Sequence, residues 1–116
     1  MRKALPMFLA LCYNFSNMNI VRQLNNKELV LSLEGELNST TASIFEDVIK
    51  NELDDVDSLI IDLAKLSYLS SAGLRILLVA QKIMMKKGGM VVRHPNNEVM
   101  EIFSLTGFSN VLDIEA

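Results

Sequence analysis

The chain has 116 residues, of which 50% are hydrophobic and 22% are charged, and its formal net charge is -3. This length and composition exclude a disordered or fibrous protein and predict one domain around one hydrophobic core. The negative charge argues against a nucleic-acid partner, because such proteins carry a basic stripe. A single cysteine, Cys12, excludes an internal disulfide and a cysteine-based zinc site, and it favours the cytoplasm.

The first 17 residues differ from the rest. Arg2 and Lys3 precede an apolar run at 4–12, which is the order found in a short secretory signal. Pro6 interrupts this run, and the run is shorter than the roughly 20 residues of a membrane-spanning helix, so direct membrane insertion is not expected. We expect 1–17 to be a poorly ordered extension or the product of an upstream start codon, with targeting as the alternative, and the compact domain to occupy 18–116.

Two short apolar stretches, 20–24 and 29–34, predict the first strands of this domain. Between them, residues 25–27 read Asn-Asn-Lys, and asparagine tolerates the left-handed backbone of a tight turn. The two strands should therefore form an antiparallel hairpin, and Gly35 is expected to end the second one.

A helix is predicted after this hairpin, because apolar residues recur at helical spacing. Ser39 or Thr40 is a plausible N-cap. Asp54 and Asp55 oppose the helix dipole at a C-terminus, so the helix should end near Leu53.

The apolar run "SLIIDL" at 58–63 predicts a strand covered on both faces, with Asp62 at its carboxyl end. A loop is expected through Ser67. The following amphipathic stretch predicts a helix from about 71 to 87, stopped by the two glycines that come next.

Three further elements complete the pattern. A strand is predicted at 90–94, then a helix whose inner positions end with Thr106 before a Gly107 cap, then an edge strand at 111–114. Strands that alternate with helices require crossover connections. The predicted fold class is therefore α/β, a single domain with a central mixed β-sheet opened by an antiparallel hairpin and joined by crossover helices.

Ligands of open α/β sheets bind beyond the carboxyl ends of the parallel strands. Asp62, Ser70, Ser71, His94 and the loop 35–40 are all predicted to lie at that edge. One serine is sufficient to cap the next helix, which leaves the second hydroxyl without a structural explanation.

A hydrolase is one interpretation of these residues, with Ser71 as nucleophile, His94 as base and Asp62 as the orienting acid. The first glycine of the nucleophile elbow and a glycine-rich oxyanion loop are both missing from the sequence. A phosphate acceptor is a better interpretation, since the N–H groups at a helix N-terminus favour an anion. Phosphate at a docking surface would then act as a switch for a partner.

Three segments carry a resemblance to a known family. "LIIDLAKLSYLSSAGLRILL" resembles the signature of STAS domains, in which a strand ends in Asp-Leu, a short loop carries the serine pair, and "SAGL" opens the next helix. "LEGELNSTTA" is similar to the family's Gly-Glu-Leu-Asp-x-x-x-Ala turn, and "EIFSLTGFSNVLDI" resembles its C-terminal Leu-Thr-Gly segment. The likeness runs from about Met18 to Ala116 and is greatest to free-standing bacterial anti-sigma factor antagonists.

The resemblance implies a switch protein without catalysis, cofactor or metal. In that family the domain binds an anti-sigma factor, commonly a GHKL-type serine kinase, and so releases a sigma factor; the kinase phosphorylates a serine and a PP2C-type phosphatase restores it. The matching acceptor is Ser71, with Ser70 as second choice. The residues implied in partner binding are Asn38, Ser39, Thr40, Asp62, Ser70, Ser71, Ala72, Gly73 and Arg75.

Two positions depart from the family pattern. Many regulated members carry Asp immediately before the acceptor, where this chain has Ser70, and the Asp of the turn is replaced by Asn38. An alternative function therefore stays open, in which the domain is a STAS subunit of another machine, such as an ABC-type lipid transporter or a stressosome-like scaffold.

Overall fold

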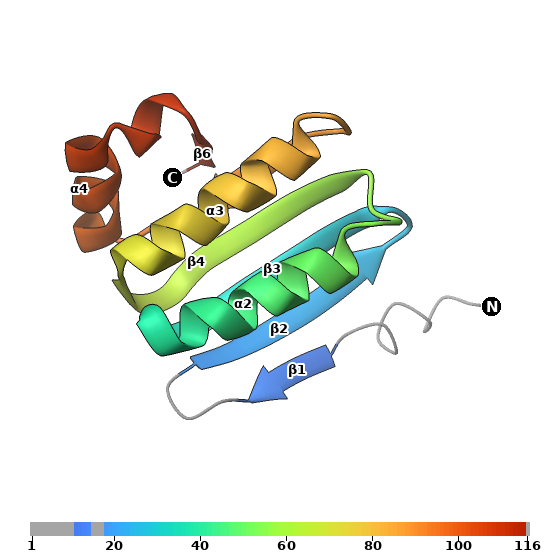
Figure 1. Cartoon of the computed structure of the whole chain (residues 1–116), viewed down its shortest axis with the longest axis horizontal. Helices are drawn as coiled ribbons and strands as arrows, with labels where there is room; N and C mark the ends of the chain where they lie inside the picture. Colours follow the sequence, from blue (N-terminus) through green and yellow to red (C-terminus); the bar gives the residue numbers. More distant parts are fainter. Residues whose placement is uncertain (1–10, 15–17, 116) are drawn as a thin grey trace.

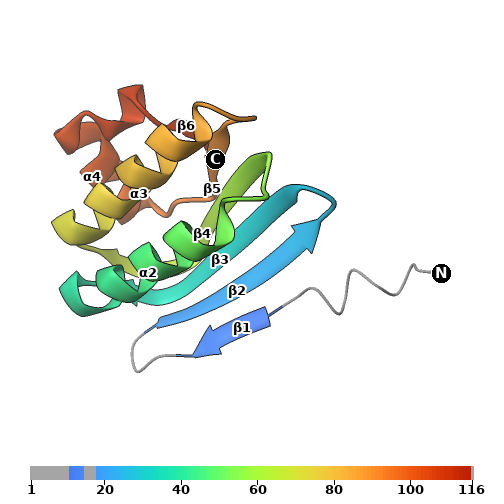
Figure 2. The ribbon, with the colours of Figure 1, turned by 45° about the vertical axis from the view of Figure 1, so that its right-hand side comes forward.

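The computed structural model describes residues 11–14 and 18–115, which form a six-stranded sheet with helices on it (Figures 1 and 2). The strands lie in chain order across the sheet and are β1 (Leu11–Asn14), β2 (Met18–Asn25), β3 (Glu28–Leu37), β4 (Ser58–Leu69), β5 (Met90–Arg93) and β6 (Asp113–Glu115). The helices are α2 (Ser39–Glu52), α3 (Ser71–Met84), α4 (Asn97–Thr106) and the short 3-10 helix η1 (Phe108–Asn110).

The sheet is mixed, as predicted. β1, β2 and β3 pair antiparallel, whereas β3, β4, β5 and β6 pair parallel. Asn26 has a φ of 57° and supplies the left-handed residue of the β2–β3 turn. Helices α2, α3 and α4 each connect two parallel neighbours, so the hairpin-opened α/β sheet with crossover helices is confirmed.

β3 and β4 are longer than predicted. Gly35 does not end β3, because a φ of 104° lets the strand continue through an irregular register to Leu37. The expected loop after Leu63 is paired strand, since β4 follows β3 to its end at Leu69. The Ser67 hydroxyl donates to the Gly35 carbonyl oxygen at 2.9 Å and so joins the extended ends of β4 and β3.

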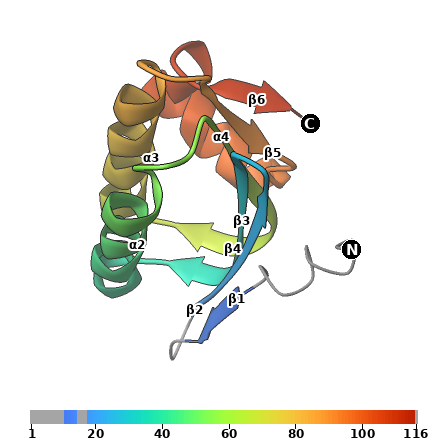
Figure 3. The ribbon, with the colours of Figure 1, turned by 90° about the vertical axis from the view of Figure 1, so that its right-hand side faces the viewer.

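Helices α2 and α3 lie side by side on one face of the sheet (Figure 3). On β4, Leu59, Ile61 and Leu63 are buried on that face, whereas Ile60 and Asp62 are only half-buried on the opposite face. The prediction that this strand is covered on both faces is therefore wrong. We call the face opposite α2 and α3 the open face.

The C-terminal elements follow the prediction with small shifts. Gly107 caps α4 with a φ of 82°, and β6 is an edge strand. The expectation that Thr106 faces inward is wrong: the residue is exposed, and its hydroxyl donates to the Ile102 carbonyl oxygen at 2.7 Å. Inward packing by α4 comes from Val99 and Phe103.

The N-terminal extension contributes one element to the described structure. β1 pairs with β2 at the edge of the sheet, a strand that the sequence patterns did not predict. The expectations for residues 1–10 and 15–17 lie outside the described residues. Within the described ranges, none of the helices has the length and apolar content needed to cross a membrane.

Candidate functional site

The starts of α2 and α3 meet where β3 and β4 end. The Ser70 backbone N–H donates to the Leu37 carbonyl oxygen at 2.9 Å, which joins the two strand ends immediately before both helices. The side chains around this junction are exposed or half-buried. We call this surface the rim; it consists of Glu36, Asn38, Ser39, Thr40, Tyr68, Ser70, Ser71 and Ala72.

The two adjacent serines have different roles. Ser70 is the N-cap of α3, and its hydroxyl oxygen accepts from the Gly73 N–H at 3.2 Å. Ser71 is the first helical residue, is exposed, and uses its hydroxyl in no hydrogen bond within the described residues. The two hydroxyls therefore differ, because only that of Ser70 stabilises the helix.

Asn38, and not Ser39 or Thr40, is the N-cap of α2. Its side-chain oxygen accepts from the N–H groups of Thr40 and Thr41, each at 3.0 Å. The Thr41 hydroxyl accepts in return from the Asn38 N–H at 2.8 Å, which completes a capping box. Ser39 and Thr40 are left exposed at the rim.

Asn38→Ala is expected to lower the free energy of unfolding by about 1 kcal/mol, because two helical N–H groups lose their acceptor. Ser39→Ala is the matched control and should change stability little, since Ser39 does not cap the helix. Chemical denaturation of both variants tests this assignment. An equal or larger loss in Ser39→Ala would contradict it.

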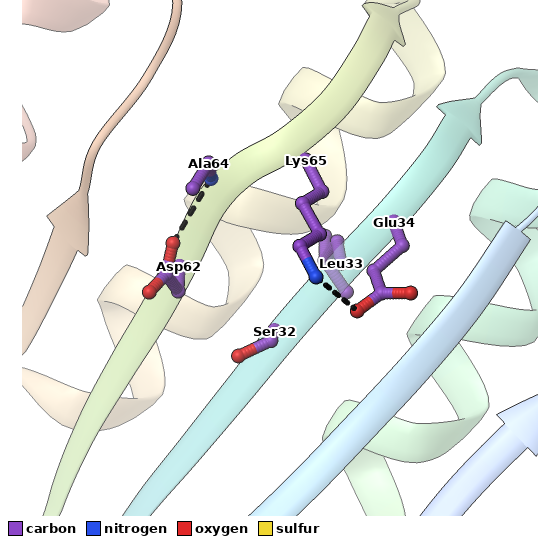
Figure 4. Close-up of a pocket in the computed structure, with 6 residues that line it drawn as sticks. All are labelled: Ser32, Leu33, Glu34, Asp62, Ala64 and Lys65. Carbon is purple, nitrogen blue, oxygen red and sulfur yellow. Dashed lines mark hydrogen bonds and ion pairs between the residues drawn. The ribbon is translucent and has the colours of Figure 1, made fainter.

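Asp62 does not lie at the rim, contrary to the prediction. It lies in the middle of β4, where it is paired with Ser32 of β3. The distance from Ser32 to the end of β3 at Leu37 is five residues, about 17 Å, so Asp62 is about that far from the rim. Its carboxylate lies on the open face and accepts from the Ala64 N–H at 2.9 Å (Figure 4). It lines a pocket of about 120 Å³ with Ser32, Leu33, Glu34, Ala64 and Lys65.

The hydrolase interpretation requires Asp62, His94 and Ser71 to meet. His94 follows directly after Arg93, the β5 residue that pairs with Asp62. Asp62 and Ser71 are separated by the remaining length of β4. The structure therefore does not assemble this triad, and the hydrolase interpretation is wrong.

Gly73 lets the first turn of α3 lie close against the strand ends. A Cβ atom at this position would lie 2.7 Å from Leu37 Cγ and 2.8 Å from Leu69 Cδ1. Gly73 is itself buried. It therefore affects the rim by positioning Ser71 and not by direct exposure to a partner.

The sequence patterns missed two residues near the rim. Tyr68 lies three residues before Ser71 and is 52% exposed, which is unusual for a large aromatic side chain and typical of docking surfaces. Asn96 caps α4 by accepting from the Val99 N–H at 2.8 Å and donates to the Leu66 carbonyl oxygen at 2.9 Å, so it ties α4 to β4. A lone aromatic among serines was the available signal for Tyr68.

Arg75 lies one helical turn after Ser71 and is exposed. Its guanidinium lies 3.7 Å from the Glu46 carboxylate of α2, which Lys50 also approaches at 3.4 Å. Exposed pairs of this kind contribute little to stability. The Arg75 side chain is therefore only weakly held by Glu46.

The sequence and the fold can be compared with known proteins at this point. A family model described as the STAS domain matches residues 17–116. The chain belongs to the STAS domain family. This STAS domain is 33% identical, over 88 residues, to BtrV of Bordetella bronchiseptica, which is named a candidate anti-sigma factor antagonist; the match covers 74% of this chain and 76% of BtrV.

Solved structures share the fold. The crystal structure of an anti-sigma factor antagonist from Mycobacterium paratuberculosis has a TM-score of 0.77 and 25% identity to this STAS domain, over 84% of this chain and 85% of that one. The STAS domain of a SulP transporter from Vibrio cholerae has a TM-score of 0.61 and 20% identity, over 80% and 76% of the two chains. The fold is therefore shared by antagonists and by a transporter domain.

Proposed function

We propose that this STAS domain is a cytoplasmic anti-sigma factor antagonist that has no catalysis of its own. It binds an anti-sigma factor through the rim and so releases a sigma factor. The partner is a GHKL-type serine kinase that phosphorylates Ser71, and a PP2C-type phosphatase removes the phosphate. The observation that carries this proposal is the exposed Ser71 hydroxyl beside a Ser70 hydroxyl already engaged as the cap. The names of BtrV and of the mycobacterial antagonist support the choice of partner.

The electrostatics of the two helix starts at the rim favour a phosphate. Neither α2 nor α3 has an acidic residue in its first turn, and both N-caps, Asn38 and Ser70, are neutral. The unpaired N–H groups and the positive dipole ends of two helices therefore face this surface. A phosphoserine with roughly -1.5 to -2 charges can be held there without unfolding α3.

The same phosphate opposes docking. A partner that covers the rim has to remove water from the added charge or place its own groups against it, which costs several kcal/mol. Each ~1.4 kcal/mol is tenfold in affinity, so phosphorylation switches the complex off. Ser70 is the weaker acceptor, because modification of its oxygen breaks the bond from Gly73.

Tyr68→Ala is expected to weaken binding of the anti-sigma factor by about tenfold or more, because exposed aromatics are the usual anchors of an interface. Its stability should stay nearly unchanged. Leu105→Ala is the matched control, since Leu105 is a large apolar residue of α4 that is 82% exposed. Calorimetric titration with both variants tests the position of the interface; equal losses, or a loss only in Leu105→Ala, would contradict it.

Affinity purification from the native cell tests the proposed partner. The tagged wild-type chain is expected to retain an anti-sigma kinase, identified by mass spectrometry, and the Ser71→Asp variant is expected to lose it. A permease, an ABC-type lipid transporter subunit or a stressosome-like scaffold in place of the kinase would contradict the proposal. That result would favour the alternative of a STAS subunit that regulates another machine.

A further inference from the structure

The open face carries an apolar strip that the proposed function does not use. Val30 of β3 pairs with Ile60 of β4, and Ile60 pairs with Val91 of β5, so the three side chains lie in one row across the sheet. All three are half-buried, whereas the alternate residues of these strands are buried under the helices. The strip therefore exposes part of three branched apolar side chains to solvent.

Carboxylates surround the strip on three sides. Asp62 lies two residues along β4 from Ile60, Glu28 lies two residues along β3 from Val30, and Asp113 of β6 pairs with Val91. Within the described residues, none of these three acids has an ion pair.

Two ion pairs also lie on the open face. Lys65 lies 3.8 Å from Glu34, and Arg93 lies 3.6 Å from Glu115. Each of these pairs is neutral overall, so Glu28, Asp62 and Asp113 leave a net negative charge around the strip, with Arg93 opposite Asp62 in the register of β4 and β5. The open face thus combines an apolar centre with an excess of negative charge.

A hollow of about 570 Å³ borders the strip at the end of the sheet where β4 and β5 begin, between the strands and the end of α3. Its lining includes Ile60 and Val91 of the strip, Glu28 and Asp113 of the surrounding acids, and Arg93. Two of the three strip residues therefore border a hollow that also has charged side chains in its lining.

We propose that the open face is a second docking surface, which binds a cationic amphipathic helix of a partner protein. A helix that lies across the strands, along the row from Val30 to Val91, has Asp62 on one side and Glu28 on the other, because each acid is two residues, about 7 Å, along its strand from the row. The apolar side of such a helix covers the strip, and its lysine or arginine side chains reach Asp62 on one side and Glu28 on the other.

A second copy of this chain is a poorer occupant of the strip. A two-fold contact brings the same surface of both copies together, so the unpaired carboxylates of each copy would face those of the other. The open face lies on the opposite side of the sheet from α2 and α3, away from the rim at the strand ends (Figure 3). A partner on the open face can therefore be bound together with one on the rim.

The test is a methyl NMR titration of the full chain with a synthetic amphipathic helix of leucine and lysine, about 18 residues long, or five turns. The expected methyl shifts are at Val30, Ile60 and Val91. The same peptide with glutamate in place of lysine should cause none. Shifts centred on the rim, or equal shifts with both peptides, would overturn the proposal.

Variants separate specific docking from general attraction between charges. The double variant Glu28→Lys with Asp113→Lys is expected to weaken the lysine peptide by about tenfold or more. Glu98→Lys with Glu101→Lys makes the same charge change on exposed positions of α4 and should leave the affinity nearly unchanged. An equal loss in both double variants would overturn the proposal.

Two further outcomes would assign the strip to another occupant. The double variant Arg2→Glu with Lys3→Glu changes no residue of the strip. If this variant shifts the methyl signals of the strip in the absence of peptide, the strip is assigned to the chain's own N-terminal residues. Strip signals that move with protein concentration would assign it to a second copy. Either result overturns the proposal of a separate partner.

Discussion

Ser71→Asp is expected to weaken the complex with the anti-sigma factor by about a hundredfold, which corresponds to about 3 kcal/mol. The aspartate places a charge at the centre of the rim, where a partner has to remove its water or repel it. Ser71→Ala should keep the affinity of the wild-type chain, because the hydroxyl holds no hydrogen bond within the described residues.

Ser71→Asn is the matched control, because asparagine has nearly the size of aspartate without its charge. Calorimetric titration of the three variants separates the effect of charge from the effect of side-chain size. The Ser71→Asp chain should bind weakly, and the Ser71→Asn chain should bind nearly as well as the Ser71→Ala chain. Thermal stability should change little, since the residue is exposed and an acid at a helix N-terminus is favourable by about 0.3–1 kcal/mol. Unchanged affinity in Ser71→Asp would contradict the switch, and an equal loss in Asn would indicate a steric effect.

Gly73→Ala is expected to lower the free energy of unfolding by about 1–2 kcal/mol. The new methyl group would lie within 2.8 Å of side-chain atoms of Leu37 and Leu69, and overpacking of this kind costs about 1–3 kcal/mol. Alanine also favours a helix over glycine by up to about 1 kcal/mol. The steric term is the larger one, so the net effect is a loss.

A double-mutant cycle with Leu37→Ala tests the cause of this loss. Removing the Leu37 side chain makes room for the methyl group, so the two changes together should cost at least about 0.5 kcal/mol less than their sum. Gly107→Ala is the matched control, because its methyl group meets nothing within 4 Å and its cost comes from a φ of 82°. The stability losses of Gly107→Ala and Leu37→Ala should therefore be additive. Additive costs for Gly73→Ala and Leu37→Ala would contradict the packing explanation.

The sequence was sufficient to predict the order of the main elements and the pairing of the first hairpin. The Asn-Asn-Lys turn predicted the hairpin of β2 and β3, and helical spacing of apolar residues predicted α2, α3 and α4. These features depend on neighbouring residues alone. β1 was missed because its first two residues, Leu11 and Cys12, end the apolar run at 4–12, which suggested targeting and not pairing with β2.

The end of β4 was not predictable from local patterns. Between the pairs Ser32–Asp62 and Leu37–Leu69, β3 advances five residues and β4 advances seven, so β4 holds two extra residues. Its buried leucines, Leu63, Leu66 and Leu69, are consequently three residues apart. That spacing breaks the alternation of a strand, which is why this segment was predicted to be a loop and Asp62 was predicted to lie at the rim.

The N-cap of α2 was not predictable from local patterns either, because its position depends on where β3 ends. Three polar residues in a row, Asn38, Ser39 and Thr40, are all suitable N-caps. Which one is used depends on where β3 ends, and the left-handed Gly35 moves that end to Leu37. Ser71, in contrast, was correctly predicted to be exposed at a helix start, because a single serine pair stands before a clear amphipathic run.

The most direct test of the proposed phosphorylation switch is tandem mass spectrometry of the chain after incubation with the proposed anti-sigma kinase and ATP. Trypsin cleaves after Lys65 and Arg75, so the peptide LSYLSSAGLR contains Ser67, Tyr68, Ser70 and Ser71 together. Fragment ions between the two adjacent serines distinguish them. We expect the phosphate on Ser71, and none on the Ser71→Ala chain. Phosphate on Ser70, or outside this peptide, would contradict the account.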